Sequence, residues 1–281
     1  MNSDHNPNKI INIREVIAKK SAKAARRTPS FVINFLNRIL HVEGLNAILL
    51  RHGHLKGAEF IDESLKDLNI TFNLSGTENI PQTDQVIFAS NHPLGGVDGL
   101  ILISQITRLT GKPIKLLVND FLMYIYPVAD LFVPINKVGG QARGSLQVID
   151  QAYRSDAPIL IFPAGLCSRK NKGKIEDLKW NKHFIQKATQ YKRDIIPVYF
   201  DGRNSNFFYN LAKIRKFLHI KVNLEMMLLP DEMFKHQGKT FNIIFGKPIP
   251  YTTFDHSRTN EEWATDVKQI VYGLKTQGNQ K

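Results

Sequence analysis

Short runs of consecutive apolar residues alternate along the chain with longer segments in which apolar residues recur every three to four positions. The short runs indicate buried strands, and the longer pattern indicates helices that place one face against a core. The predicted strands are residues 69–74, 85–90, 114–118, 131–136, 158–162, 194–200 and 240–245. The predicted helices are residues 99–109, 121–130, 144–155, 206–218 and a terminal helix opened by a capping box of Thr259 and Glu262. This alternation predicts an α/β fold with a mixed, largely parallel sheet flanked by helices.

The first 68 residues follow a different pattern and predict an N-terminal basic, amphipathic helical region, appended to a domain formed by residues 69–281. Residues 13–28 are rich in lysine and arginine, and residues 31–40 carry apolar side chains on one helical face. Residues 48–68 predict a further helix, interrupted near Gly53 and Gly57. A basic segment beside an amphipathic helix is typical of contact with an anionic membrane surface. The alternative is that the apolar face packs against the rest of the protein.

The charge balance favours anionic partners, because 38 basic and 25 acidic residues give a net charge of +13. Nucleic acid, anionic lipid, the phosphates of coenzyme A and an acidic carrier protein all fit this balance. The single cysteine, Cys167, excludes an internal disulfide and a cysteine-based zinc site, and it fits a reducing cytoplasm. We expect no signal peptide and no transmembrane helix, since no uninterrupted apolar stretch reaches about 18 residues.

The strongest chemical signal lies between the predicted strand 85–90 and the predicted helix 99–109, where residues 91–99 read NHPLGGVDG. Turns at the carboxyl ends of strands carry the chemistry of many α/β proteins. The two glycines allow a tight turn that brings Asp98 within reach of His92. A carboxylate on one imidazole nitrogen fixes the tautomer and leaves the other nitrogen free to accept a proton. No serine or cysteine stands in the turn, so a substrate hydroxyl would have to be the nucleophile. A surface ion pair is the simpler alternative.

This turn resembles the first sequence block of the glycerolipid acyltransferase family, which includes the lysophosphatidic acid acyltransferases. Residues 162–169 read FPAGLCSR and resemble the family's second block, FPEG. Most members separate the histidine and aspartate by four residues, whereas five separate them here. This HX5D form is similar to a bacterial branch labelled hemolysin-like or ornithine-lipid-type. The resemblance implies transfer of a fatty acyl group from acyl-CoA or acyl carrier protein to a lipid hydroxyl, at the inner face of the cell membrane.

The resemblance also implies the catalytic roles. His92 would remove the proton of the acceptor hydroxyl, and Asp98 would orient and stabilise the imidazolium. Backbone N–H groups around Gly95 and Gly96 are candidate donors to the oxyanion. No metal or other cofactor is expected, because thiolate is a good leaving group.

Five further residues are predicted to bind substrate. Lys137 or Arg143 lies near the place where the family carries an arginine for the acceptor phosphate, although ordinary surface charge explains both. Gly165 suits a tight backbone turn. Ser168 and Arg169 can hydrogen-bond an anion, the arginine through its planar fork.

The second block departs from the family pattern at Ala164, where a glutamate is usual, and at residues 166–167, which replace a threonine and an arginine. In the main branch these positions help bind the groups of glycerol 3-phosphate. The departure therefore favours an acylated amino acid that bears a hydroxyl, as in ornithine or glycine lipids, over lysophosphatidic acid. Cys167 is predicted to be a packing residue.

Two basic stretches follow these blocks in the sequence. Residues 169–193 hold nine basic and two acidic residues, which predicts either a landing surface for phosphates or a solvated helical face. The predicted helix at residues 206–218 is both apolar and basic, and its apolar side chains are predicted to pack in the core or to border the acyl chain.

Two other classes of function stay open. A non-catalytic basic protein that binds anionic membrane or nucleic acid would keep its binding after replacement of His92 and Asp98. A metal-dependent hydrolase built on the same pair lacks a convincing third ligand, and a chelator would identify it. The acyltransferase prediction includes no nucleic-acid partner.

Overall fold

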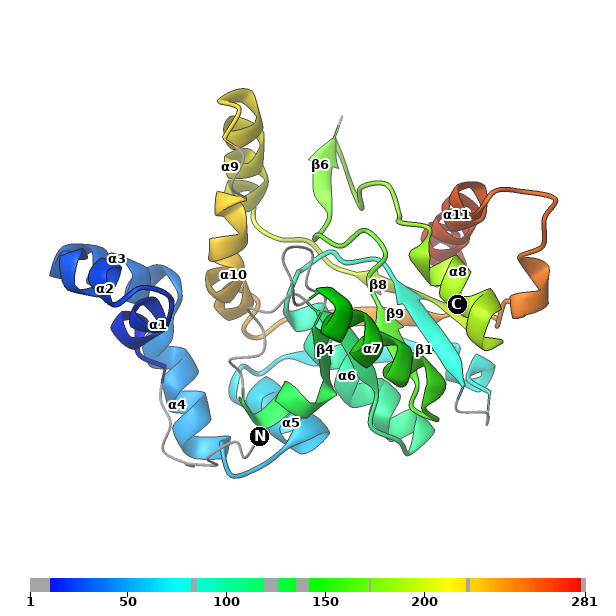
Figure 1. Ribbon diagram of the computed structural model, residues 1–281, viewed down its shortest axis with the longest axis horizontal. Coiled ribbons are helices and arrows are strands. Elements are labelled where there is room, and N and C mark those ends of the chain that lie inside the picture. The colour runs from blue at the N-terminus through cyan, green and yellow to red at the C-terminus, as the bar shows by residue number, and fades with distance from the viewer. Residues whose placement is uncertain are drawn as a thin grey trace.

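A single sheet organises the computed structural model, which describes residues 11–81, 85–118, 126–134, 142–171, 173–220 and 223–278. Within these ranges the sheet has seven strands in the order β1-β9-β8-β2-β5-β3-β4 (Figure 1). The strands are β1 (Thr71–Ser75), β2 (Val86–Ser90), β3 (Lys115–Val118), β4 (Phe132–Pro134), β5 (Ile159–Ile161), β8 (Asp194–Asp201) and β9 (Thr240–Phe245). Every neighbouring pair is parallel except β8 and β9. The predicted mixed, largely parallel sheet is confirmed.

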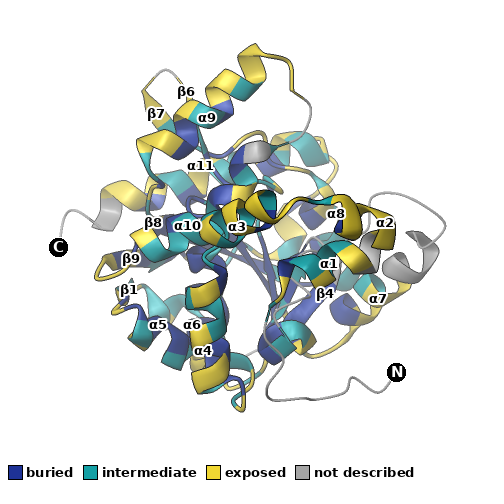
Figure 2. Ribbon diagram, turned by 90° about the vertical axis from the view of Figure 1, so that its left-hand side faces the viewer, coloured by how far each residue is buried: buried dark blue, intermediate teal, exposed yellow. Residues whose placement is uncertain are grey.

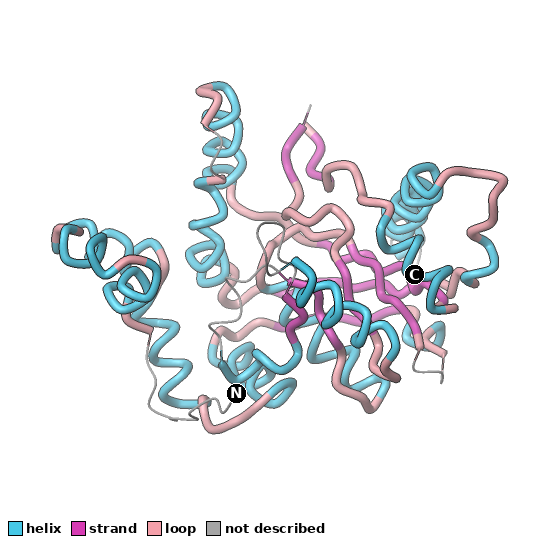
Figure 3. The backbone as a smooth tube through the Cα atoms, viewed as in Figure 1, coloured by secondary structure: helices cyan, strands magenta, loops and turns pink. Residues whose placement is uncertain are grey.

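Helices cover both faces of the sheet (Figure 3), and the alternation of side chains along each strand divides the core between them. Val86 and Phe88 of β2 pack with helices α4 (Val42–His52), α5 (Gly57–Asp67) and α6 (Val97–Thr110). Ile87 and Ala89 point the other way, to α7 (Ala142–Arg154), α8 (His183–Tyr191) and α11 (Asn260–Gly278). Burial on both faces explains why β2 reads as an unbroken apolar run. The dark-blue centre of Figure 2 shows this buried sheet.

The basic stretch after the second block forms two different elements. Strands β6 (Arg169–Asn171) and β7 (Lys174–Glu176) make an antiparallel hairpin, and α8 follows. Further along are α9 (Asn206–Phe217), α10 (Leu229–Lys235) and the short 3₁₀ segments η1 (Thr77–Asn79), η3 (Tyr126–Leu131), η4 (Leu224–Leu228) and η5 (Tyr251–Thr253). The capping box of α11 is confirmed: the Thr259 N–H donates to Glu262 Oε2 at 2.8 Å, and the Glu262 N–H donates to Thr259 Oγ1 at 3.3 Å.

The N-terminal segment forms α1 (Ile13–Lys20), α2 (Ala22–Arg27), α3 (Ser30–Ile39) and α4 (Val42–His52). Ile13, Ile33 and Val42 make a small core between these helices. His41 joins them to α10, since its Nε2 lies 2.8 Å from Asp231 Oδ1 and its ring stacks on Phe234. The helical character predicted for this region is therefore found, while the boundary at residue 68 stays a prediction.

The apolar residues of α3 divide between two environments. Ile33 is buried, whereas Phe31 and Phe35 are exposed. Packing therefore explains one part of the predicted apolar face and leaves two aromatic side chains in solvent. No helix among the described residues has the length and apolarity that a membrane crossing requires.

Candidate functional site

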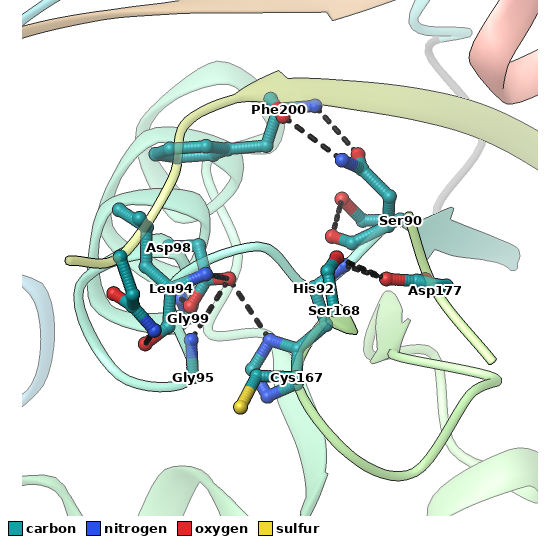
Figure 4. A network of polar contacts seen from close by, with 12 residues as sticks. Ser90, His92, Leu94, Gly95, Asp98, Gly99, Cys167, Ser168, Asp177 and Phe200 are labelled. Atoms are coloured by element: carbon teal, nitrogen blue, oxygen red, sulfur yellow. Dashed lines mark hydrogen bonds and ion pairs between the residues drawn. The ribbon is translucent and has the colours of Figure 1, made fainter. Parts of the chain in front are cut away.

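The two sequence blocks leave the sheet side by side. Strands β2 and β5 are parallel neighbours with Ala89 paired to Ile161, so the residues that follow them emerge at the same edge. The Asn91 side chain then ties the end of β2 to β8. Its Nδ2 donates to the Phe200 carbonyl oxygen at 2.9 Å, and the Phe200 N–H donates to its Oδ1 at 2.7 Å (Figure 4). These bonds fix the starting point of the turn.

Asp98 receives four hydrogen bonds within this turn. Its Oδ2 lies 3.0 Å from His92 Nδ1 and accepts the N–H groups of Leu94 and Gly95 at 2.9 and 3.3 Å, and its Oδ1 accepts the Gly99 N–H at 2.9 Å (Figure 4). Burial opposes ionisation, but the His92 charge and these donors outweigh it and hold the pKa of Asp98 below its usual value. The first turn of α6 also favours a negative charge. The predicted contact between His92 and Asp98 is present.

His92 is held as a nearly buried imidazole. Its side chain is 15% exposed, and its ring stacks on Phe162 at a centroid distance of 3.9 Å. Burial lowers its pKa, but the charge and hydrogen bond of Asp98, with the charge of Asp177, outweigh that effect and raise the pKa above 6.5. Because Nδ1 faces Asp98, Nε2 is the nitrogen that can exchange a proton. No hydrogen-bond partner for Nε2 is found in the part of the chain that the structure describes.

Asp177 connects the two blocks, and sequence reasoning missed it. Its Oδ1 accepts the His92 N–H at 3.2 Å and the Ser168 hydroxyl at 2.6 Å, while its Oδ2 accepts the Trp180 indole N–H at 2.9 Å. The Ser168 N–H also donates to the His92 carbonyl oxygen at 2.7 Å (Figure 4). Desolvation raises the pKa of Asp177. The sequence offered one indication: Asp177 is one of two acidic residues among the nine basic residues of the stretch 169–193.

The anion-binding groups predicted in the second block are already engaged. Ser168 is buried, and both its hydroxyl and its N–H are donated within the protein. Arg169 Nη2 lies 2.8 Å from Glu225 Oε1, and Nη1 donates to the Cys167 carbonyl oxygen. Arg215 Nε contacts the other oxygen of Glu225 at 2.8 Å. The Arg169 fork is therefore occupied by a protein carboxylate, because a fully buried carboxylate such as Glu225 needs charged partners. Two guanidinium groups on one carboxylate leave one net positive charge.

The other predicted residues have mixed outcomes. Lys137 lies outside the described residues, and of Arg143 only the backbone, within α7, is described. Gly165 has φ +67°, and its N–H donates to the Phe162 carbonyl oxygen, so the tight turn is present. Cys167 is fully buried, and burial raises its pKa to about 11, as suits a packing residue. The substrate-binding assignments of Lys137, Arg143, Gly165, Ser168 and Arg169 stay predictions.

The two glycines of the turn have different environments. Gly95 has φ +80°, and a Cβ there would lie 2.8 Å from Leu229 Cδ2. Its N–H donates to Asp98, which removes it from the candidate oxyanion donors in this arrangement. A Cβ on Gly96 would meet no heavy atom within 4 Å. Gly96 therefore borders open space and keeps its place as a candidate donor.

Among the described residues, no group of three or more His, Cys, Asp or Glu is placed to hold a metal ion.

Replacing Gly95 by alanine is expected to destabilise the protein by about 2 kcal/mol, because the new Cβ adds left-handed backbone strain and a close contact. Gly96→Ala is the matched control, since it adds the same methyl group one residue later into open space. Thermal unfolding of both variants measures the difference. Equal melting temperatures would show that the turn tolerates a side chain at Gly95.

A family model and two curated relatives show which family the chain is similar to. The model of a family described as Acyltransferase matches residues 15–279. A protein of Bacteroides thetaiotaomicron named lyso-glycine lipid O-acyltransferase is 44% identical over 265 residues, covering 94% of this chain and 97% of that protein. A protein of the same name from Phocaeicola vulgatus is 42% identical over 265 residues, covering 94% and 95%. A crystal structure of the 1-acyl-sn-glycerophosphate acyltransferase PlsC from Thermotoga maritima is similar with a TM-score of 0.45 and 16% identity, covering 87% of this chain and 92% of that chain.

Proposed function

The chain belongs to the acyltransferase family, and from this premise we propose that its acceptor is a glycine lipid precursor that carries one acyl chain and a free hydroxyl. Membership makes the protein an O-acyltransferase that acts on a lipid precursor in membrane lipid synthesis, which sets aside the non-catalytic basic protein and the hydrolase. The observation that carries the choice of acceptor is the likeness, over nearly the whole chain, to two proteins named for lyso-glycine lipid.

The proposed mechanism begins at His92. Its neutral Nε2 removes the proton of the acceptor hydroxyl while that oxygen attacks the thioester carbonyl carbon. Asp98, on Nδ1, stabilises the imidazolium that forms and keeps the ring in one orientation. Collapse of the tetrahedral intermediate breaks the carbon–sulfur bond, and the thiolate takes the proton back from His92. The products are an ester and a free thiol, and His92 returns to its neutral form.

The backbone around the turn has a second part in this mechanism. The developing oxyanion needs hydrogen-bond donors placed before the reaction. The Gly96 N–H, at the N-terminus of α6, is the candidate, since a negative charge is favoured there. Phe162 stacks on the imidazole and shields it from water, which strengthens the interaction between His92 and Asp98.

The charges near the site support an acceptor with a carboxylate headgroup. Arg169 follows Ser168, whose N–H donates to the His92 carbonyl oxygen at 2.7 Å, so the cluster of Arg169, Glu225 and Arg215 begins beside the site. Its single net positive charge matches one carboxylate better than a phosphate monoester. Ala164, where the main branch carries a glutamate, fits the same distinction. The headgroup of a glycine lipid offers one carboxylate and no amine.

The donor and the place of action complete the proposal. An acyl-CoA or an acyl carrier protein supplies the thioester, and the basic residues of 169–193 attract the phosphates of the one or the acidic surface of the other. No further cofactor takes part. The exposed cations Lys23, Arg26, Arg27 and Arg38, with Phe31 and Phe35, hold the protein on the anionic inner face of the cell membrane.

A competition experiment tests the acceptor. Purified protein receives one acyl donor and equal concentrations of lyso-glycine lipid and lysophosphatidic acid, and mass spectrometry quantifies both esters. We expect lyso-glycine lipid to react about tenfold faster or more, because one unsatisfied charge on a phosphate monoester accounts for a difference of that size. A lyso-ornithine lipid in a parallel reaction tests whether an added ammonium is rejected. Faster acylation of lysophosphatidic acid would show that the acceptor is assigned wrongly.

A further inference from the structure

Helix α9 carries two apolar faces, and only one of them is covered. Phe208 and Tyr209 are buried in a small core with Cys167 and Leu228, and Ala212 is buried as well. The other face lies in solvent: the exposed fractions are 60% for Phe207, 55% for Ile214, 81% for Phe217 and 57% for Leu218. These four residues are seven, three and one positions apart, so they form one stripe along the helix. The predicted roles of core packing and of contact with an acyl chain therefore leave this outer stripe unexplained.

The outer stripe lies on a helix that projects from the body of the protein. Figure 1 shows α9 standing out from the body of the protein beside the β6–β7 hairpin, and Figure 2 shows much of its surface as exposed. Phe217 and Leu218 lie at the carboxyl end of the helix, where the chain turns back. Phe217 is 81% exposed, so moving its side chain from water into an apolar environment is favourable.

The charge around the stripe identifies what covers it. Lys213 and Lys216 are exposed beside Ile214 and Phe217, and the whole stretch from residue 202 to residue 222 contains no aspartate or glutamate. Apolar side chains flanked by cations, with no acidic residue among them, fit the boundary between headgroups and acyl chains of an anionic bilayer. A protein partner would have to match an apolar stripe and the cations beside it in the same narrow strip.

The base of α9 is tied to the catalytic turn. Asn204, just before the helix, donates from Nδ2 to the Leu94 carbonyl oxygen at 3.2 Å, and Ser205 caps the helix at Phe208. The Arg169 guanidinium carbon lies over the Phe208 ring, 5.6 Å from the centroid of that ring. Ile39, at the end of α3, packs against the same small core as Phe208. Contact between α9 and lipid would therefore hold the catalytic turn next to the surface that contains the acceptor.

We propose that the outer stripe of α9 inserts into an anionic lipid bilayer as a membrane contact separate from the N-terminal helices. The stripe enters the acyl boundary through Phe217 and Leu218, and Lys213 and Lys216 bind the headgroups above it. The inference rests on the proposed function only in taking a bilayer lipid as the acceptor. It concerns binding, so it is measured with no donor or acceptor present.

Vesicle sedimentation tests the proposal. Vesicles of phosphatidylcholine alone and of phosphatidylcholine with phosphatidylglycerol are mixed with the full chain and with three double variants. Phe217→Ser with Leu218→Ser is expected to lower the partition coefficient about tenfold or more on anionic vesicles. Lys213→Gln with Lys216→Gln is expected to remove most of the preference for anionic over neutral vesicles. The matched control, Leu178→Ser with Ile270→Ser, changes two side chains that are each 45% exposed elsewhere, and it should bind as the unchanged protein does.

A fluorescence measurement tests insertion of the stripe directly, without relying on variants that lose vesicle binding. Phe217→Trp adds an indole at the end of the stripe, and lipids with brominated acyl chains should quench its emission beyond the quenching seen in the unchanged protein. Equal binding by the serine variant, equal loss in the control, or no added quenching would each overturn the proposal. A change of molecular mass in light scattering without a change in vesicle binding would show that a second copy covers the stripe, and would overturn it too. Turnover of lyso-glycine lipid in detergent micelles tests the proposed function separately.

Discussion

Replacing His92 by alanine is expected to lower the rate of acyl transfer about 10²–10⁴-fold while the protein stays folded. In the proposed mechanism His92 is the base that takes the hydroxyl proton, and Asp98 and Phe162 hold its ring in place. The measurement is release of free thiol from the acyl donor in the presence of the acceptor, with thermal unfolding as the check on folding.

Cys167→Ala is the control for this experiment, because it removes the single thiol of the chain, which a covalent thioester mechanism would use. Its thiol is fully buried with a pKa raised to about 11, so the variant should keep nearly all of the activity. A folded His92→Ala protein with near-normal turnover would overturn the mechanism. Loss of activity in the cysteine variant, with its fold intact, would point instead to an acyl-enzyme.

Asp98→Asn is expected to be almost as severe, with a loss of about 10²–10⁴-fold. The carboxylate accepts the Leu94, Gly95 and Gly99 N–H groups as well as facing the imidazole. An amide has one acceptor oxygen, so its Nδ2 must face either backbone donors or the ring. It also carries no charge to stabilise the imidazolium.

The pH dependence separates this loss of charge from a loss of shape. In the unchanged protein the activity falls as the pH drops through the pKa of His92, because a protonated imidazole cannot accept the hydroxyl proton. Asp98 is the main group that raises this pKa above 6.5 against the effect of burial. The residual activity of Asp98→Asn should therefore fall at a lower pH than the activity of the unchanged protein. An unshifted acidic limb would mean that Asp98 acts through geometry alone.

The sheet and the catalytic pair were predictable because their signals are local. An unbroken apolar run such as 86–89 has few alternatives to a strand that is buried on both faces. His92 and Asp98 lie six positions apart on a turn with glycine, so their contact follows from the reach of the chain. The capping box of α11 is equally local.

The partners of the second block were not predictable because they come from distant segments. Glu225 lies 56 residues beyond Arg169, and no periodicity links the two positions. Asp177 was counted as one of two acids in a basic stretch, but only the fold shows that it is buried against His92 and Trp180. The two faces of α9 likewise have the same sequence character, and only packing makes them different.

All four hydrogen bonds described for Asp98 come from residues 92–99, so the pairing of His92 with Asp98 is formed within one short segment. The charge cluster beside it, in contrast, is assembled from three separate segments that carry Arg169, Arg215 and Glu225. We expect substitutions in those segments to change which headgroup is recognised while the contact between His92 and Asp98 is kept. Because the turn and the charge cluster belong to different segments, the acceptor specificity can change during evolution while the His92–Asp98 turn is kept. Protein engineering could change the acceptor specificity in the same way.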